Sequence, residues 1–180
     1  MAITDHNTTK GAFINGIVPD FLIIPGIEIS TDRGHLLGIG IQDQISNTDV
    51  EEAIDIIHDS GGVAAIPHPG RLFSGAIHQY GDLDINAIEV INGRSFPAQN
   101  KKAALIANDL HLAAIGGSDA HSLWEAGSAF TIAEAQTIDD LIAAIIKKET
   151  LVGGTSSMLR PLRAAGKALI RYVSDGLVKV

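Results

Sequence analysis

Short apolar runs alternate along this chain with segments of helical periodicity. The runs at 63–66, 87–91 and 112–115 have the length and composition of buried strands. Between them, residues 49–60 and about 98–110 place small and branched apolar side chains at helical spacing. Strands that alternate with helices indicate an α/β fold with a parallel sheet. In such folds the residues that follow the strands gather at one edge of the sheet, where ligands bind.

The first part of the chain contains further strand candidates. Ala2-Ile3 has the character of the end of a buried strand. The run 21–24 is expected to be a strand buried on both faces that stops at Pro25-Gly26. Residues 27–30 alternate apolar and polar side chains, and residues 35–41 form another apolar run. All of these segments are expected to join the same sheet.

The last part of the chain begins with a short strand candidate at 130–132. Residues 137–140 have the pattern of a capping box and are expected to open a helix. The segment from Pro161 onwards has an apolar face and a basic stripe, as expected of an amphipathic helix. We therefore expect one domain over residues 1–155 and a helical tail over 156–180.

Composition narrows the classes of protein to which the chain can belong. Of its 180 residues, 46% are apolar, which is enough for the core of one domain. The absence of cysteine excludes disulfides, thiolate zinc sites and a cysteine nucleophile, and it fits a cytoplasmic protein. No apolar run approaches the ~20 residues of a membrane span. The net charge of −8 argues against nucleic-acid binding by charge alone, although residues 160–180 carry a net charge of +4.

Candidate metal ligands stand at the ends of most expected strands. The stretch 116–121 follows a strand and presents a carboxylate and an imidazole two positions apart, on the same side of an extended segment. The full set has four histidines and two carboxylates: His6, Glu28, His35, His68, Asp119 and His121. Nitrogen and oxygen ligands without sulfur suit Zn, Mn or Fe. The set exceeds the needs of one ion, which favours a two- or three-metal site of the kind that acts on phosphate esters.

These residues also have ordinary structural interpretations. Asp119 could cap a helix, His35 could lie at a strand edge, and Arg71 and Arg94 could be surface residues. Glu28 is harder to explain in this way. A carboxylate isolated between two isoleucines is costly to bury unless it is paired or bound to a metal.

Five short motifs together resemble the PHP (polymerase and histidinol phosphatase) family. They occur in that family's order and cover roughly residues 2–133. The motifs are Ile3-Thr4-Asp5-His6-Asn7, Gly26-Ile27-Glu28-Ile29-Ser30, His35-Leu36-Leu37-Gly38, Pro67-His68-Pro69-Gly70-Arg71 and Gly117-Ser118-Asp119-Ala120-His121. The resemblance implies a distorted (β/α)7 barrel with a metal cluster at the carboxyl ends of its strands. It also implies hydrolysis of phosphoesters by a metal-activated water.

The resemblance further implies a role for each candidate ligand. Glu28 would bridge two metals, and His35 and His68 would complete the protein ligands of the second. Asp119 would ligate the first metal, and His6 and His121 would ligate the third. The cofactor would then be two or three divalent ions of zinc, manganese or iron.

Arginine side chains would bind the substrate. Arg71, within the His-Pro-x-Arg pattern, would bind phosphate through its planar guanidinium, and Arg94 is a second candidate. The catalytic set implied is Asp119, His121 and Arg71. The substrate could be a small phosphomonoester, a nucleotide or an oligonucleotide end, so a nucleic-acid partner stays open, whereas a membrane partner is not expected.

One motif of the family is not matched. PHP domains open with a strand that carries His-x-His, and here Met1 stands directly before the second motif. The sequence thus predicts a barrel that is incomplete at its N-terminus and lacks its first β/α unit. A non-catalytic PHP fold with a structural or interaction role is the alternative function.

Overall fold

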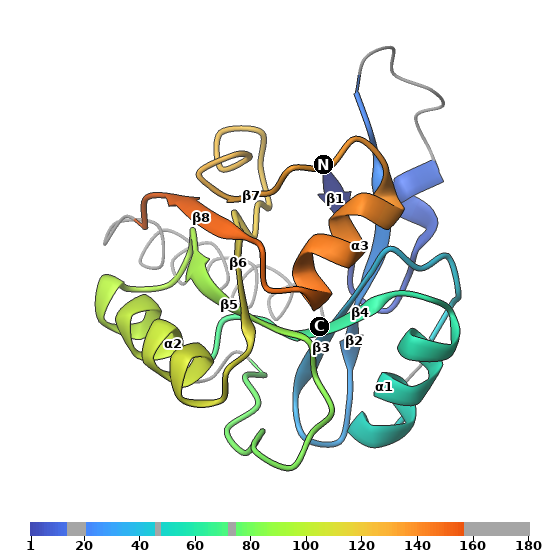
Figure 1. The fold of residues 1–180 in the computed structure, drawn as a ribbon, viewed down its shortest axis with the longest axis horizontal. Helices are drawn as coiled ribbons and strands as arrows, with labels where there is room; N and C mark the ends of the chain where they lie inside the picture. Colours follow the sequence, from blue (N-terminus) through green and yellow to red (C-terminus); the bar gives the residue numbers. More distant parts are fainter. Residues whose placement is uncertain (14–20, 46–47, 72–74, 157–180) are drawn as a thin grey trace, which may run out of the picture.

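The described part of the computed structural model comprises residues 1–13, 21–45, 48–71 and 75–156 (Figure 1). Its strands are β1 (Ala2–Ile3), β2 (Ile24–Ser30), β3 (His35–Ile39), β4 (Val63–Ile66), β5 (Ala87–Asn92), β6 (Ala113–Gly117), β7 (Ala129–Ile132) and β8 (Leu151–Gly154). Its helices are the short 3-10 helix η1 (Lys10–Phe13), α1 (Val50–Asp59), α2 (Pro97–Asp109) and α3 (Ile138–Ile146). These elements confirm the α/β class. None of the described helices is long and apolar enough to cross a membrane.

The main sheet has six strands in the order β1-β2-β3-β4-β5-β6, and β7 and β8 form a second, two-stranded sheet. The expectation of a wholly parallel sheet is wrong, because β3 runs antiparallel to both β2 and β4. A tight turn joins β2 to β3, with the Thr31 N–H bonded to the Gly34 carbonyl at 2.8 Å, and such a turn is too short for a parallel crossover. The described strands form a curled, open sheet, so the (β/α)7 barrel stays an expectation from the family resemblance.

The strand expected at 21–24 is also misplaced. Phe21 and Leu22 are 48% and 45% exposed, and β2 begins only at Ile24 and continues through Pro25-Gly26. Proline is tolerated near the beginning of a strand, where one missing N–H donor costs little. Most of the apolar run 21–24 therefore precedes the strand, and the alternating segment 27–30 forms part of it.

Two apolar clusters cover the two faces of the main sheet. On one face, sheet residues such as Ile27 and Ile88 pack with α1 and α2, for example with Ile57 of α1. On the other face, sheet residues such as Leu37 pack with Ile145 of α3. Because side chains alternate across a strand, the residues between members of the first cluster emerge on the face of the second. Both glutamates of the sheet, in β2 and β5, occupy such positions.

The boundaries of α1 and α2 agree closely with those predicted from the sequence. Asp49 caps α1 by accepting from the N–H of Glu52, and Thr137 and Asp140 form the expected capping box of α3. Strand β8 pairs with β7 and was not anticipated. The helix expected in the tail lies within 157–180, outside the described residues.

Candidate metal and phosphate site

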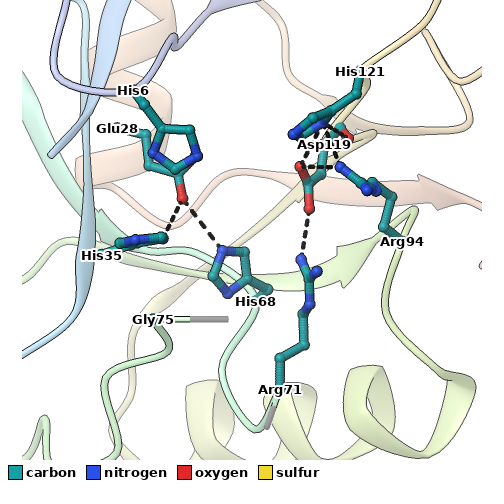
Figure 2. Close-up of a pocket in the computed structure, with 9 residues that line it drawn as sticks. All are labelled: His6, Glu28, His35, His68, Arg71, Gly75, Arg94, Asp119 and His121. Atoms are coloured by element: carbon teal, nitrogen blue, oxygen red, sulfur yellow. Dashed lines mark hydrogen bonds and ion pairs between the residues drawn. The ribbon is translucent and has the colours of Figure 1, made fainter. Parts of the chain in front are cut away.

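A single pocket brings the candidate residues together. Its volume is about 440 Å³, and Figure 2 shows its lining. The lining side chains are His6, Glu28, His35, His68, Arg71, Arg94, Asp119 and His121, with the backbone of Gly75. His35 reaches this edge because β3 is reversed: its first residue lies where β2 ends. Within the pocket the side chains form two groups, which we call the histidine half and the arginine half.

The histidine half is built around Glu28. Its Oε1 lies 2.9 Å from Nδ1 of His35 and 3.3 Å from Nε2 of His68, and its Oε2 lies 3.6 Å from Nε2 of His6. Burial alone would raise the pKa of Glu28, but the contacts with His35 and His68 and the nearby His6 outweigh it and hold the pKa far below its usual range. The carboxylate is therefore charged and is held by three imidazoles.

The N-terminal segment presents His6 through backbone bonds to β2. The Glu28 N–H bonds to the Asp5 carbonyl at 3.1 Å, and the Asn7 N–H bonds to the Glu28 carbonyl at 2.8 Å. The Asn7 side chain also accepts from the Ser30 N–H at 2.8 Å. Asp5 thus acts here through its carbonyl, in keeping with a supporting role in the turn.

Gly75 shapes the wall behind His35. A Cβ at this position would lie 2.5 Å from Nε2 of His35, and its φ of +68° is one that side-chain-bearing residues rarely adopt. The Gly75 carbonyl also accepts from the His35 N–H at 2.6 Å. The imidazole therefore lies against bare backbone.

The arginine half is built around Asp119. Nη1 of Arg71 donates to Oδ2 of Asp119 at 2.7 Å, while Nη1 of Arg94 and Nδ1 of His121 lie 3.7 Å and 3.5 Å from Oδ1. Glu125 accepts from the His121 N–H at 2.8 Å and so ties the loop after β6 to the site. Two guanidinium groups on one carboxylate make this half cationic.

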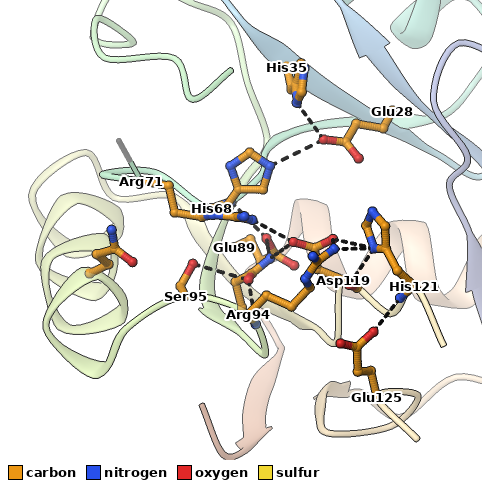
Figure 3. A network of polar contacts seen from close by, with 12 residues as sticks. Glu28, His35, His68, Arg71, Glu89, Arg94, Ser95, Asp119, His121 and Glu125 are labelled. Atoms are coloured by element: carbon orange, nitrogen blue, oxygen red, sulfur yellow. Dashed lines mark hydrogen bonds and ion pairs between the residues drawn. The ribbon is translucent and has the colours of Figure 1, made fainter. Parts of the chain in front are cut away.

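A buried acid that sequence reasoning missed lies beneath both halves. Glu89 on β5 is only 5% exposed, and its Oε2 accepts from the His68 N–H at 2.8 Å and from Nδ2 of Asn92 at 2.9 Å (Figure 3). The same Asn92 nitrogen lies 3.3 Å from Oδ2 of Asp119. The pKa of Glu89 is raised to about 8, chiefly by burial and also by the Asp119 and Glu28 carboxylates, while the Asn92 and His68 donors oppose the rise. The sequence signal that could have identified Glu89 is its position as a single acid between Ile88 and Val90.

The donor set fits a divalent cation. Ligand atoms of His6, Glu28 and His35 all lie within 4.8 Å of one another, and Nε2 of His68 faces the same carboxylate. Within the described residues, Nδ1 of His68 is buried without a hydrogen-bond partner. Imidazole and carboxylate ligands of this kind suit zinc, manganese or iron. Asp119 and His121 stand apart from this group, in the arginine half.

The loop that follows the site carries two exposed apolar side chains. Leu123 and Trp124 are 92% and 93% exposed, directly before the Glu125 that holds His121. Neither side chain lines the pocket.

Comparison with known proteins agrees with this architecture. Residues 97–150 match the PHP-associated family model, PHP_C. The fold also matches a two-domain protein from Bacteroides vulgatus that contains a predicted PHP-like metal-dependent phosphoesterase. That match has a TM-score of 0.64 at 19% identity, over 85% of this chain and 55% of that one. The chain thus carries a PHP-associated region within a PHP-like fold. The fold is also similar to that of PsfC from Pseudomonas syringae, at a TM-score of 0.54 and 20% identity, over 84% of this chain and 66% of that one.

The sequence relatives of this chain are longer than the part that it matches. An uncharacterized protein of Methanocaldococcus jannaschii is 33% identical over 140 residues, which are 72% of this chain and 55% of the relative. The 5'-3' exoribonuclease Rnm of Salmonella typhimurium is 37% identical over 78 residues, which are 40% of this chain and 27% of that protein. The chain spans about half the length of the M. jannaschii protein and about a quarter of Rnm.

Proposed function

We propose that this chain hydrolyses phosphoesters with the help of bound divalent ions. The observation that carries the proposal is the pairing of the two halves in one pocket. Three imidazoles surround a charged, largely buried Glu28, and two guanidinium groups stand beside them. A cation site next to an anion site is what a hydrolase needs in order to hold a phosphate and activate water against it.

The histidine half would hold the metal. Glu28, His35 and His68, joined by His6, offer one carboxylate and three imidazole groups. Bound there, divalent ions would supply Lewis-acid activation of a water and neutralise phosphate charge. Asp119 and His121 are further candidate ligands, as the family resemblance implies, and we propose two or three ions of zinc, manganese or iron.

The arginine half would bind the substrate. A guanidinium matches two phosphate oxygens with two parallel N–H donors, so Arg71 and Arg94 can orient a phosphate toward the histidine half. Asp119 pairs with both of these cations. The exoribonuclease activity named for the Salmonella relative makes a 5'-phosphorylated RNA end one candidate substrate, besides a small phosphomonoester or a nucleotide.

A phosphatase screen tests the proposal. The chain is assayed with Mn²⁺, Zn²⁺ or Fe²⁺ on p-nitrophenyl phosphate, bis-p-nitrophenyl phosphate, 5'-nucleotides and a 5'-phosphorylated oligoribonucleotide. We expect hydrolysis that chelator removes and metal restores, and that His35→Asn reduces at least about 100-fold. His78→Asn is the matched control, because His78 is exposed and does not line the pocket.

Two results would contradict the proposal. Full activity in His35→Asn would place the chemistry outside this pocket. A metal-loaded wild-type chain that hydrolyses none of these substrates would favour the non-catalytic alternative.

A further inference from the structure

The two halves of the pocket are joined by one buried pair, Glu89 and Asn92. Glu89 bonds to the backbone N–H of His68, in the histidine half, at 2.8 Å. Asn92 bonds to Glu89 at 2.9 Å and reaches Asp119, in the arginine half, at 3.3 Å. Both members are fully enclosed, with Glu89 5% and Asn92 0% exposed. The pair therefore lies behind the site and does not line the pocket itself.

The residues held by this pair have unusual backbone conformations. His68 has a φ of +33° and Asp119 a φ of +48°, both in the left-handed region. Side-chain-bearing residues keep such conformations only where surrounding contacts impose them. Glu89 supplies such a contact to the His68 N–H, and Asn92 supplies one to the Asp119 carboxylate.

The surroundings leave room for this arrangement. A Cβ on Gly117 would lie 2.4 Å from Oε1 of Glu89, so the carboxyl group fits only because β6 has a glycine there. Asn92 is further fixed by its own bonds: its Oδ1 accepts from the Arg94 N–H at 2.9 Å and from Oγ of Ser95 at 3.2 Å. The amide therefore has one orientation, with its nitrogen directed at Glu89 and Asp119.

We propose that Glu89 is a positioning residue: through its own oxygen and the amide of Asn92, it fixes the backbone of His68 and the carboxylate of Asp119 relative to one another. This inference rests on the proposed function, since it assigns a role within that site. Glu89 neither faces the pocket nor touches the candidate substrate position. Its contribution is to keep the histidine half and the arginine half at a constant separation.

Two substitutions of Glu89 separate hydrogen bonding from packing. Glu89→Gln retains an oxygen that can accept from the His68 N–H and the Asn92 amide. Glu89→Leu removes every acceptor while filling much of the same space. Ile88→Val is the control for core damage, because Ile88 is fully buried on the same strand and packs on the opposite face. Asn92→Ser serves as a second test if the Leu variant fails to fold.

The readouts are Co²⁺ affinity by calorimetry, the visible absorption bands of bound Co²⁺, and the ¹⁵N resonances of the histidine rings in metal-free protein. We expect Glu89→Leu to weaken Co²⁺ at least tenfold, to shift its bands and to move the His68 and His121 resonances. Asn92→Ser should move the His121 resonance. Glu89→Gln should stay within about threefold of wild type in affinity, and Ile88→Val should match the wild-type spectra.

Unchanged spectra in Glu89→Leu would overturn the positioning role, and so would unchanged His121 resonances in Asn92→Ser. Equal losses of Co²⁺ affinity in Glu89→Gln and Glu89→Leu would also overturn the positioning role. So would a loss in Ile88→Val equal to that in Glu89→Leu, if the two variants have the same melting temperature. The histidine resonances need neither metal nor substrate. They therefore decide the role of Glu89 even if the wild-type chain binds no Co²⁺ or hydrolyses no phosphoester, which would count against the proposed function alone.

Discussion

Nη1 of Arg71 donates to Oδ2 of Asp119 at 2.7 Å, across 48 positions of sequence. The bond joins the loop after β4 to the loop after β6, and both side chains are mostly enclosed, at 20% and 15% exposure. A largely buried ion pair is costly to break by removing one partner, because the other charge is left uncompensated. Asp119 therefore offsets part of the positive charge of the arginine half, and a phosphate or a metal ion would compete for one of its members.

Replacing Asp119 tests this competition. In Asp119→Asn, we expect hydrolysis to fall about 100-fold or more. Inorganic phosphate should bind at least as tightly as to wild type, because Arg71 and Arg94 lose their anionic partner. Steady-state kinetics and calorimetry measure the two effects. Wild-type activity in this variant would remove Asp119 from the mechanism.

Gly75→Ala tests the wall behind His35. The new methyl group would meet the imidazole and would also strain a φ of +68°, so we expect a loss of about 1 kcal/mol or more in unfolding free energy, together with weaker metal binding. Gly81→Ala is the control, because within the described residues nothing lies within 4 Å of a Cβ there. Urea unfolding and metal titration check both variants. Equal behaviour of the two variants would contradict the assigned role of Gly75.

Glu89 should give the metal-free protein a distinctive pH dependence. Its pKa is raised from 4.5 to about 8 on folding, so between these values the folded state binds more protons than the unfolded state. The contribution of Glu89 to stability is therefore fully present below pH 4.5 and is lost as pH rises through about 8. Relative to Glu89→Gln, wild-type stability should decline across this window and level off above it. Urea unfolding from pH 5 to pH 9 with chelator tests this, and a constant difference would contradict it.

The capping box of α3 gives a prediction about stability alone. Thr137 accepts from the Asp140 N–H at 3.1 Å, and Asp140 accepts in return from the Thr137 N–H at 3.0 Å. Thr137→Ala should lower the unfolding free energy by about 1 kcal/mol and leave hydrolysis unchanged, since α3 does not line the pocket. Gln136→Ala is the control, because the bond of Gln136 to Asp140 is made by its backbone N–H. Thermal unfolding of both variants is the measurement.

The two glutamates of the sheet show which site residues could be predicted from the sequence and which could not. Glu28 was singled out because it lies between isoleucines and within a recognisable motif, and the structure places it among three histidines. Glu89 lies in an equally apolar strand but has no ligand-type neighbour in sequence. It contacts His68 directly and Asp119 through Asn92, and both come from other strand ends, so only the folded sheet brings them to it.

The direction of β3 is the second feature that the sequence did not predict. Periodicity locates β3 but does not reveal which way it runs, because alternation looks the same in both directions. The deciding feature was the short Thr31–Gly34 turn, which compels an antiparallel partner. That reversal explains why His35, at the beginning of a strand, contacts Glu28 near the end of another. Both residues thus line one pocket, although the sequence analysis described the sheet around them incorrectly.

Trp124 gives the protein a built-in optical probe. It is the only tryptophan of the chain, it is 93% exposed, and it stands next to the Glu125 that holds the backbone of His121. Its emission should therefore report the water around one loop, free of background from other indoles. A blue shift on adding metal or phosphate would show that this loop becomes shielded when the pocket fills, and a stopped-flow instrument could follow it on an unlabelled protein.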